Sequence, residues 1–169
     1  EFSKNKNIVN QLNIPTSSIN SLETCINLVD TNKFHDSGLI HAKIKLPNKT
    51  NELKSYISEM YKNVYKIRDS LLFSDFKSFN NLINDNWKFK KKISGKISTK
   101  KIDNLIASGL KNGSISSRLL GSGKGGFIMF FVDPQKIHNF NNWIKKNKLK
   151  SKKIKFDNSG LEVWRTFEK

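Results

Sequence analysis

The chain has 169 residues and a mass of 19.5 kDa, and 36% of its residues are hydrophobic, which favours one compact domain over two independent ones. Lysine and arginine number 31 against 14 aspartates and glutamates, so the net charge of +17 raises the question of a polyanionic partner. Only three of the basic residues are arginines, however, and an A/T-rich codon bias accounts for much of the lysine. The single cysteine, Cys25, excludes an internal disulfide framework and suits a reducing compartment, so we expect a cytoplasmic protein. No apolar run approaches the roughly 18 residues of a membrane span, and no membrane partner is expected.

Apolar residues at helical spacing dominate the first two thirds of the chain. They predict helices over residues 19–29, 53–71, 76–93 and 98–112, of which the second and third pack antiparallel. Gly113 stands where a left-handed residue ends a helix. Residues 31–51 break the pattern and contain at most one short strand, at 39–46.

After Gly113 the chain becomes richer in β-branched and aromatic residues. Strands are predicted at 115–120, 127–132, 153–157 and 161–167, with a helix opened by Pro134 between the second and the third. Trp87, Trp143 and Trp164 all lie on or beside apolar stripes and are predicted to be core residues. Helices followed by such a sheet predict an α+β domain in which helices cover one face of an antiparallel sheet.

A glycine-rich loop joins the first two of these strands and spells G-x-G-x-x-G at Gly121, Gly123 and Gly126. The dinucleotide fingerprint needs a helix directly after the turn, whereas a strand follows here. The P-loop pattern fails as well, because Lys124 is followed by glycine and not by serine or threonine. Four glycines in six positions allow close backbone approach, either to a ligand phosphate or to neighbouring backbone, or else form a wide structural hairpin.

The stretch GSISSRLLGSGKGGFIMFFV, residues 113–132, resembles the third conserved motif of GHMP-type small-molecule kinases, G-A-x-x-x-K-L-x-G-A-G-x-G-G-x. Residues 84–97 and 98–113 are similar to helices of the heptose 7-phosphate kinase branch, and residues 2–11 to its segment t-G-x-x-R-x-A-x-x-I-x-x-x-Q. The resemblance implies a C-terminal kinase domain, or a fragment of one, over residues 1–169. It implies a ferredoxin-like antiparallel sheet with helices on one face, residues 1–112 being mainly helical with an insertion at 31–51 and 113–169 forming the glycine-loop sheet core.

Several positions depart from the family pattern. Ser122 replaces the usual alanine, Lys124 puts a charge inside the loop, Arg118 takes a lysine position, Lys4 an arginine position and Asn84 a histidine position. The phosphate-cradling loop of the family, P-x-x-x-G-L-G-S-S-A, is absent from these 169 residues. The main ATP site is therefore expected in a missing N-terminal half, and no catalytic residue is assigned.

For an ATP-dependent sugar or sugar-phosphate kinase, the resemblance implies ATP and Mg²⁺ as cofactors and the N-terminal kinase half as a partner. The loop backbone that would line the phosphoryl-transfer site belongs to Gly121, Ser122, Gly123, Gly125 and Gly126. The cations that would hold the phosphate of the substrate are Lys90, Lys91, Arg118 and Lys124.

The alternative is a non-catalytic basic module that binds RNA or DNA through the lysines at 88–101 and 145–155. Lysine without interleaved arginine or exposed aromatic residues reads bases poorly, and such a module has no use for the glycine loop, so nucleic acid is the less favoured partner. The histidines, at 35, 41 and 138, lack other ligands at metal spacing, and no metal site is expected.

Overall fold

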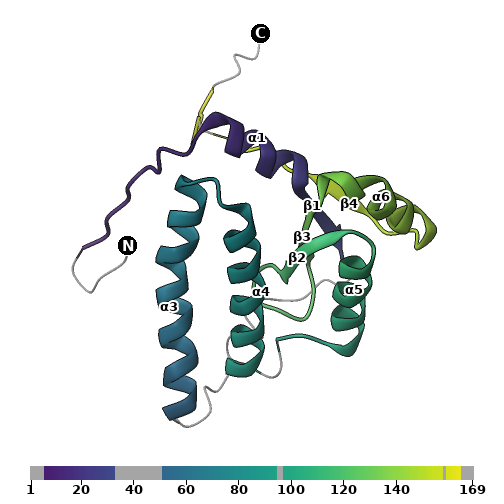
Figure 1. Cartoon of the computed structure of the whole chain (residues 1–169), viewed down its shortest axis with the longest axis horizontal. Helices are drawn as coiled ribbons and strands as arrows, with labels where there is room; N and C mark the ends of the chain where they lie inside the picture. Colours follow the sequence, from purple (N-terminus) through teal and green to yellow (C-terminus); the bar gives the residue numbers. More distant parts are fainter. Residues whose placement is uncertain (1–5, 33–50, 95–96, 158, 165–169) are drawn as a thin grey trace.

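The computed structural model describes residues 6–32, 51–94, 97–157 and 159–164 (Figure 1). The expected strand at 39–46 lies outside these residues, and so do two of the three histidines, His35 and His41. The elements in chain order are α1 (Thr16–Cys25), β1 (Ile26–Asp30), α3 (Asn51–Leu72), α4 (Phe76–Ile93), α5 (Lys100–Lys111), β2 (Ser114–Leu119), β3 (Phe127–Val132), the 3-10 helix η1 (Pro134–Lys136), α6 (Ile137–Lys146) and β4 (Ser151–Lys153). None of the helices in the described ranges is long and apolar enough to cross a bilayer.

The four strands form one antiparallel sheet in the order β2-β3-β1-β4. This arrangement confirms the predicted α+β class with a ferredoxin-like sheet. On β3 alternate residues face opposite sides, and Ile128, Phe130 and Val132 point to the side covered by α5 and α6. Phe140 and Trp143 of α6 pack on Phe130 there, at ring-centroid distances of 5.4 and 5.9 Å.

A second layer covers the opposite side of the sheet. Phe131 of β3 packs with Leu22 of α1 and with Phe79 and Ile83 of α4, and Ile67 of α3 borders the same cluster. The helices α5 and α6 thus provide the predicted cover on one face of the sheet. On the other face, α1 and the α3–α4 pair add a further layer. Figure 1 shows α3 and α4 side by side on one flank of the strands and α5 on the other.

Local signals explain where the long helices begin and end. Asp75 caps α4 by accepting a hydrogen bond from the backbone N–H of Ser78, at 3.0 Å, and Thr99 caps α5 in the same way. The chain leaves α5 through Gly113, whose φ of 116° suits glycine. The predicted antiparallel pair α3–α4 and the predicted helix α5 are all present.

Three predicted elements, the helix at 19–29 and the strands at 153–157 and 161–167, differ from the structure. The helix predicted over 19–29 ends at Cys25, because Ile26–Asp30 pairs with β3 as a strand and spacing alone does not separate the two forms. At the other end β4 comprises only Ser151–Lys153, and residues 159–164 form no strand. Trp164, predicted to be core, is exposed.

Candidate functional site

The glycine loop connects β2 to β3 and bends through several left-handed residues. Gly121, Gly123, Lys124 and Gly126 have φ values of 73°, 111°, 59° and 87°. Side chains rarely adopt this backbone conformation, so the glycines are required by the path of the chain itself.

The centre of the loop packs against a neighbouring segment. A Cβ at Gly123 would lie 2.5 Å from Ile97 Cγ1 and 2.8 Å from the Ile97 carbonyl oxygen. The backbone N–H of Lys124 donates to that same carbonyl at 2.8 Å. Of the two uses expected for a close backbone approach, Gly123 therefore serves contact with neighbouring backbone. A Cβ at Gly121 or at Gly126 would meet no heavy atom within 4 Å among the described residues.

Both ends of the loop are held by hydrogen bonds. The Gly126 carbonyl accepts from the backbone N–H of Thr31 at 2.9 Å and from its hydroxyl at 2.8 Å. At the other end the Gly121 carbonyl accepts from Lys90 Nζ at 3.1 Å, and that bond is exposed. The Lys90 bond is thus the more accessible of the two attachments.

Lys90 at the end of α4 and Arg118 of β2 form a partly buried pair of cations beside the loop. Burial lowers the pKa of Lys90, and the nearby charge of Arg118 lowers it further. Burial also lowers the pKa of the Arg118 guanidinium. Arg118 Nε is buried without a hydrogen-bond partner, and neither cation pairs with a carboxylate in the described part of the chain. Two partly desolvated positive charges without a counter-charge make a site suited to an anion.

The other two predicted cations, Lys91 and Lys124, have different surroundings from Lys90 and Arg118. Lys91 pairs with Asp103 at 3.2 Å and lies over the ring of Trp87 at 5.8 Å, so its charge is already compensated. Lys124 forms no ion pair with any residue that the structure describes, and its backbone N–H is taken by Ile97. Within the loop, Ser122 is half-buried and Gly125 is buried.

Asn84 is a positioning residue whose role the sequence did not reveal. Its side-chain amide donates to the Ile115 carbonyl at 3.1 Å and accepts from the Ser117 N–H at 3.2 Å. These two groups belong to the outer edge of β2, directly before Arg118. The residue was recognisable as a departure from the family pattern, but its partners lie more than 30 positions away.

The groups present fit a phosphate better than a metal ion. Two uncompensated cations and a backbone loop with open space at Gly121 and Gly126 suit phosphate oxygens. No group of three or more His, Cys, Asp or Glu side chains that could hold a metal ion occurs in the described ranges.

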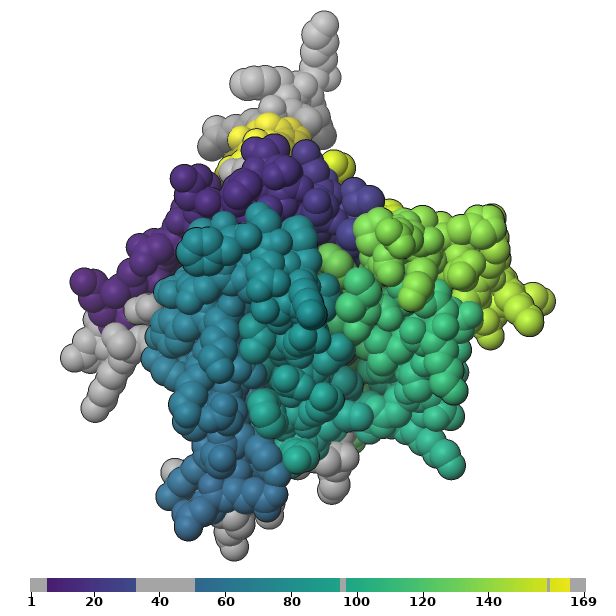
Figure 2. Space-filling model, in the orientation of Figure 1, coloured from purple at the N-terminus to yellow at the C-terminus, as the bar shows by residue number. Residues whose placement is uncertain are grey.

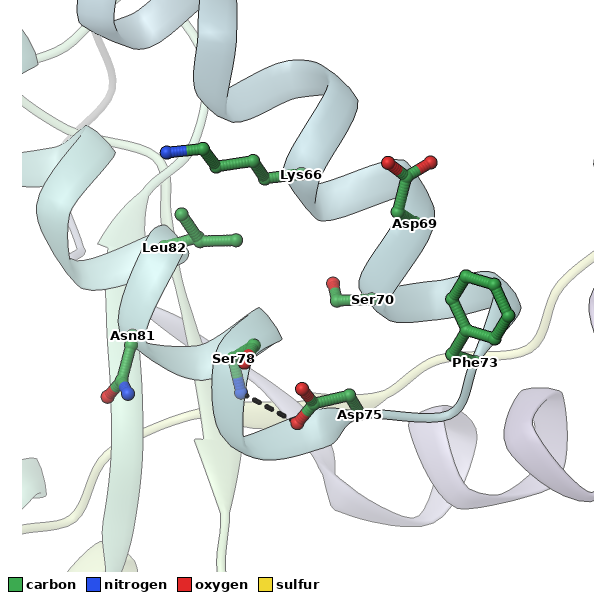
Figure 3. A pocket seen from close by; sticks show the side chains of 8 residues that line it. All are labelled: Lys66, Asp69, Ser70, Phe73, Asp75, Ser78, Asn81 and Leu82. Atoms are coloured by element: carbon green, nitrogen blue, oxygen red, sulfur yellow. Dashed lines mark hydrogen bonds between the residues drawn. The ribbon is translucent and has the colours of Figure 1, made fainter.

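Two cavities lie at the opposite end of α4 from the glycine loop. One, of about 460 Å³, lies between α3 and α4 near their connection (Figure 3). Its acidic groups already have structural partners, since Asp75 caps α4 and Asp69 pairs with Arg68 at 2.7 Å. The other, of about 520 Å³, lies between α1, the start of α4 and the sheet. Neither contributes to the loop site.

The chain resembles known proteins in both sequence and structure. Residues 60–142, which include the glycine loop, match the family model of the C-terminal domain of GHMP kinases. Residues 60–142 thus belong to the GHMP kinase C-terminal domain family. The chain is 31% identical, over 169 residues, to the D-glycero-alpha-D-manno-heptose 7-phosphate kinase of Campylobacter jejuni subsp. jejuni serotype O:2, with 98% of this chain and 49% of that protein covered.

Solved structures agree with this assignment. A Campylobacter jejuni protein assigned as a sugar kinase is 28% identical, with a TM-score of 0.69 and coverage of 98% of this chain and 46% of that one. A D-glycero-D-manno-heptose 1-phosphate kinase from Bacteriodes thetaiotaomicron shares the fold at 17% identity and a TM-score of 0.63, with coverage of 95% and 42%. The chain thus spans about half the length of the relatives it matches. The nucleic-acid alternative gains no support from them.

Proposed function

We propose that residues 1–169 are the C-terminal half of an ATP-dependent kinase that phosphorylates a hydroxyl of a sugar or sugar phosphate. The support is the similarity to heptose phosphate kinases, together with the partly buried, uncompensated cations next to the glycine loop. The N-terminal half would bring the loop that cradles the ATP phosphates, and ATP with Mg²⁺ would supply the phosphoryl group. The single cysteine keeps the cytoplasm as the expected location.

Lys90 and Arg118 are the residues that we assign to the phosphate of the substrate. A phosphate dianion compensates both charges, and the planar guanidinium offers it a pair of parallel donors while the ammonium acts as a point charge. Lys91 is a weaker candidate because Asp103 already neutralises it. Lys124 lies within the loop and is the remaining candidate from the predicted set.

The glycine loop would act by position. Phosphoryl transfer depends mainly on alignment and on stabilisation of charge on the transferred group, and relies little on covalent catalysis by side chains. With its centre fixed on Ile97 and its ends held by Lys90 and Thr31, the loop keeps the Gly121 backbone beside Lys90. One observation carries the proposal. Lys90 and Arg118, which pair with no carboxylate in the described part of the chain, lie next to the glycine loop.

The test is a fusion protein that joins this chain to the part of the Campylobacter jejuni relative outside the aligned region. We expect ATP-dependent phosphorylation of a heptose 7-phosphate, detected by mass spectrometry. Arg118→Gln should raise KM for the sugar phosphate by about tenfold or more, since a hydrogen bond to a charged group contributes ~1.5–3 kcal/mol. Lys88→Gln is the control, because Lys88 pairs with Asp85 away from the loop. Equal turnover of phosphorylated and unphosphorylated sugar would show that the cation pair holds no substrate phosphate.

A further inference from the structure

The chain after β4 is fastened to the last turn of α1. The Glu23 carboxylate pairs with Lys155 Nζ and accepts from the backbone N–H of Phe156 at 2.9 Å. Lys153 Nζ donates to the Thr24 carbonyl at 2.7 Å. These contacts fix the direction in which the C-terminal segment leaves the domain, and Figure 1 shows the chain passing beyond α1 there.

Beyond this anchor, the segment 159–164 exposes its apolar side chains almost completely. Leu161, Val163 and Trp164 are 92%, 84% and 78% exposed. Residues 160–164 make no hydrogen bond to any residue in the described ranges, so their backbone donors and acceptors remain available. Figure 2 shows the yellow atoms near this end at the margin of the molecule, next to α1. A fixed base with a free apolar end is typical of a segment that docks on something else.

The comparisons indicate which surface could receive this segment. The alignment with the heptose kinase covers 98% of this chain, so the segment has a counterpart in a protein about twice as long. A second copy of this chain is disfavoured because its charge of +17 and the lysines beside the segment repel an identical molecule. The remaining half of the kinase is therefore the occupant that these observations favour.

We propose that Leu161, Val163 and Trp164 form a docking strand for the N-terminal half of the kinase. The inference rests on the proposed function. The extended segment would add to an exposed sheet edge through its backbone, with Leu161 and Val163 on one side and Trp164 on the other. Its apolar side chains would be buried only when both halves are present.

Trp164 is a built-in probe for this docking. The other two tryptophans, Trp87 and Trp143, are only 5% and 6% exposed, so acrylamide should quench mainly Trp164 in the isolated chain. In the fusion protein described above, we expect this quenching to be lost. Trp164→Phe in the isolated chain should remove the quenchable fluorescence, which assigns that signal to Trp164.

Two variants separate docking from folding. Val163→Asp should restore the acrylamide quenching of Trp164 in the fusion protein, whereas Glu162→Gln, at an exposed neighbour, should leave Trp164 shielded. Both positions lie outside the packed core, and circular dichroism checks that the domain is unchanged. A Trp164 that stays quenchable in a fusion protein with kinase activity overturns the docking strand and leaves the proposed function standing. Shielding without kinase activity supports the docking strand and contradicts the proposed function. Concentration-dependent shielding in the isolated chain would identify a second copy as the occupant and overturn the proposal.

Discussion

At the scale of single residues, Gly123 lies where a side chain would collide with Ile97. We expect Gly123→Ala to destabilise the domain by more than Gly121→Ala, the matched control, because both have positive φ but only Gly123 is crowded. The strain shared by both variants is ~1–3 kcal/mol, and the clash adds to it only at Gly123. Urea unfolding measures the difference. Equal destabilisation would mean that the loop can move away from Ile97.

This contact changes what an inactive Gly123 variant would mean. The sequence left open whether the loop glycines approach a ligand phosphate or neighbouring backbone, and at Gly123 the structure places the Ile97 backbone. Loss of activity in a Gly123→Val variant of the fusion protein would therefore report a displaced loop. Gly121 and Gly126, which have open space, are the better positions to probe contact with phosphate.

Lys90 should make anion binding sensitive to pH. Burial and the charge of Arg118 lower the pKa of Lys90, so the ammonium loses its proton at a lower pH than an ordinary lysine. Only the charged form attracts an anion, so the affinity of this chain for sulfate, which stays a dianion over this range, should fall as pH rises from neutral through that lowered pKa. Calorimetry measures it. Lys90→Met should remove the dependence and Lys91→Met should preserve it, and a dependence that survives in Lys90→Met would assign it to another group.

At the scale of elements, Asn84 fixes α4 to the outer edge of β2. Asn84→Ala leaves the Ile115 carbonyl without its donor and the Ser117 N–H without its acceptor. We therefore expect a loss of ~1–3 kcal/mol in the free energy of unfolding. The same substitution should accelerate hydrogen exchange at the Ser117 amide, because that N–H loses its acceptor. Asn81→Ala, an exposed asparagine of the same helix, should change stability by no more than about 0.5 kcal/mol. Unchanged Ser117 exchange would show that α4 does not secure this edge.

The same elements show what the sequence could determine. The helices α3, α4 and α5 were predictable from their regular apolar spacing, and Asp75, Thr99 and Gly113 mark boundaries of α4 and α5. Strand β1 was missed because Ile26–Asp30 continues the apolar spacing of α1, and only pairing with β3 makes it a strand. A strand at 161–167 was predicted from composition, but residues 159–164 have no partner strand in the described domain.

The candidate site was predicted in part for the same reason. Motif and charge, which are local properties, indicated the glycine loop, Lys90 and Arg118, and their use as a substrate site stays a prediction. Lys91 was included with them because a sequence does not show that Asp103 neutralises it. Ile97 and Thr31, which hold the loop, were not found, because Thr31 lies 95 positions from its partner Gly126 and neither carries a distinctive side chain.

At the scale of the whole molecule, the isolated chain should not bind Mg-ATP tightly or hydrolyse it. The family loop that cradles the ATP phosphates is absent from its sequence, and the described ranges hold no cluster of metal ligands. We expect a dissociation constant weaker than micromolar, which corresponds to about −8 kcal/mol, in calorimetry. The fusion protein is the positive control. Micromolar binding by the isolated chain would place a nucleotide site within these 169 residues.

The two margins of the sheet are closed by different means. Along β2 the α4 helix occupies the outer backbone groups through Asn84. Along β4 the strand is only three residues long and fully exposed, and it carries Lys152 and Lys153. A short, positively charged margin is a poor template for strand-by-strand growth between molecules, which an open margin otherwise invites. Within the lysine-rich stretch at 145–155, Lys152 and Lys153 thus have a use that requires no ligand, since they discourage the chain from polymerising into fibrils.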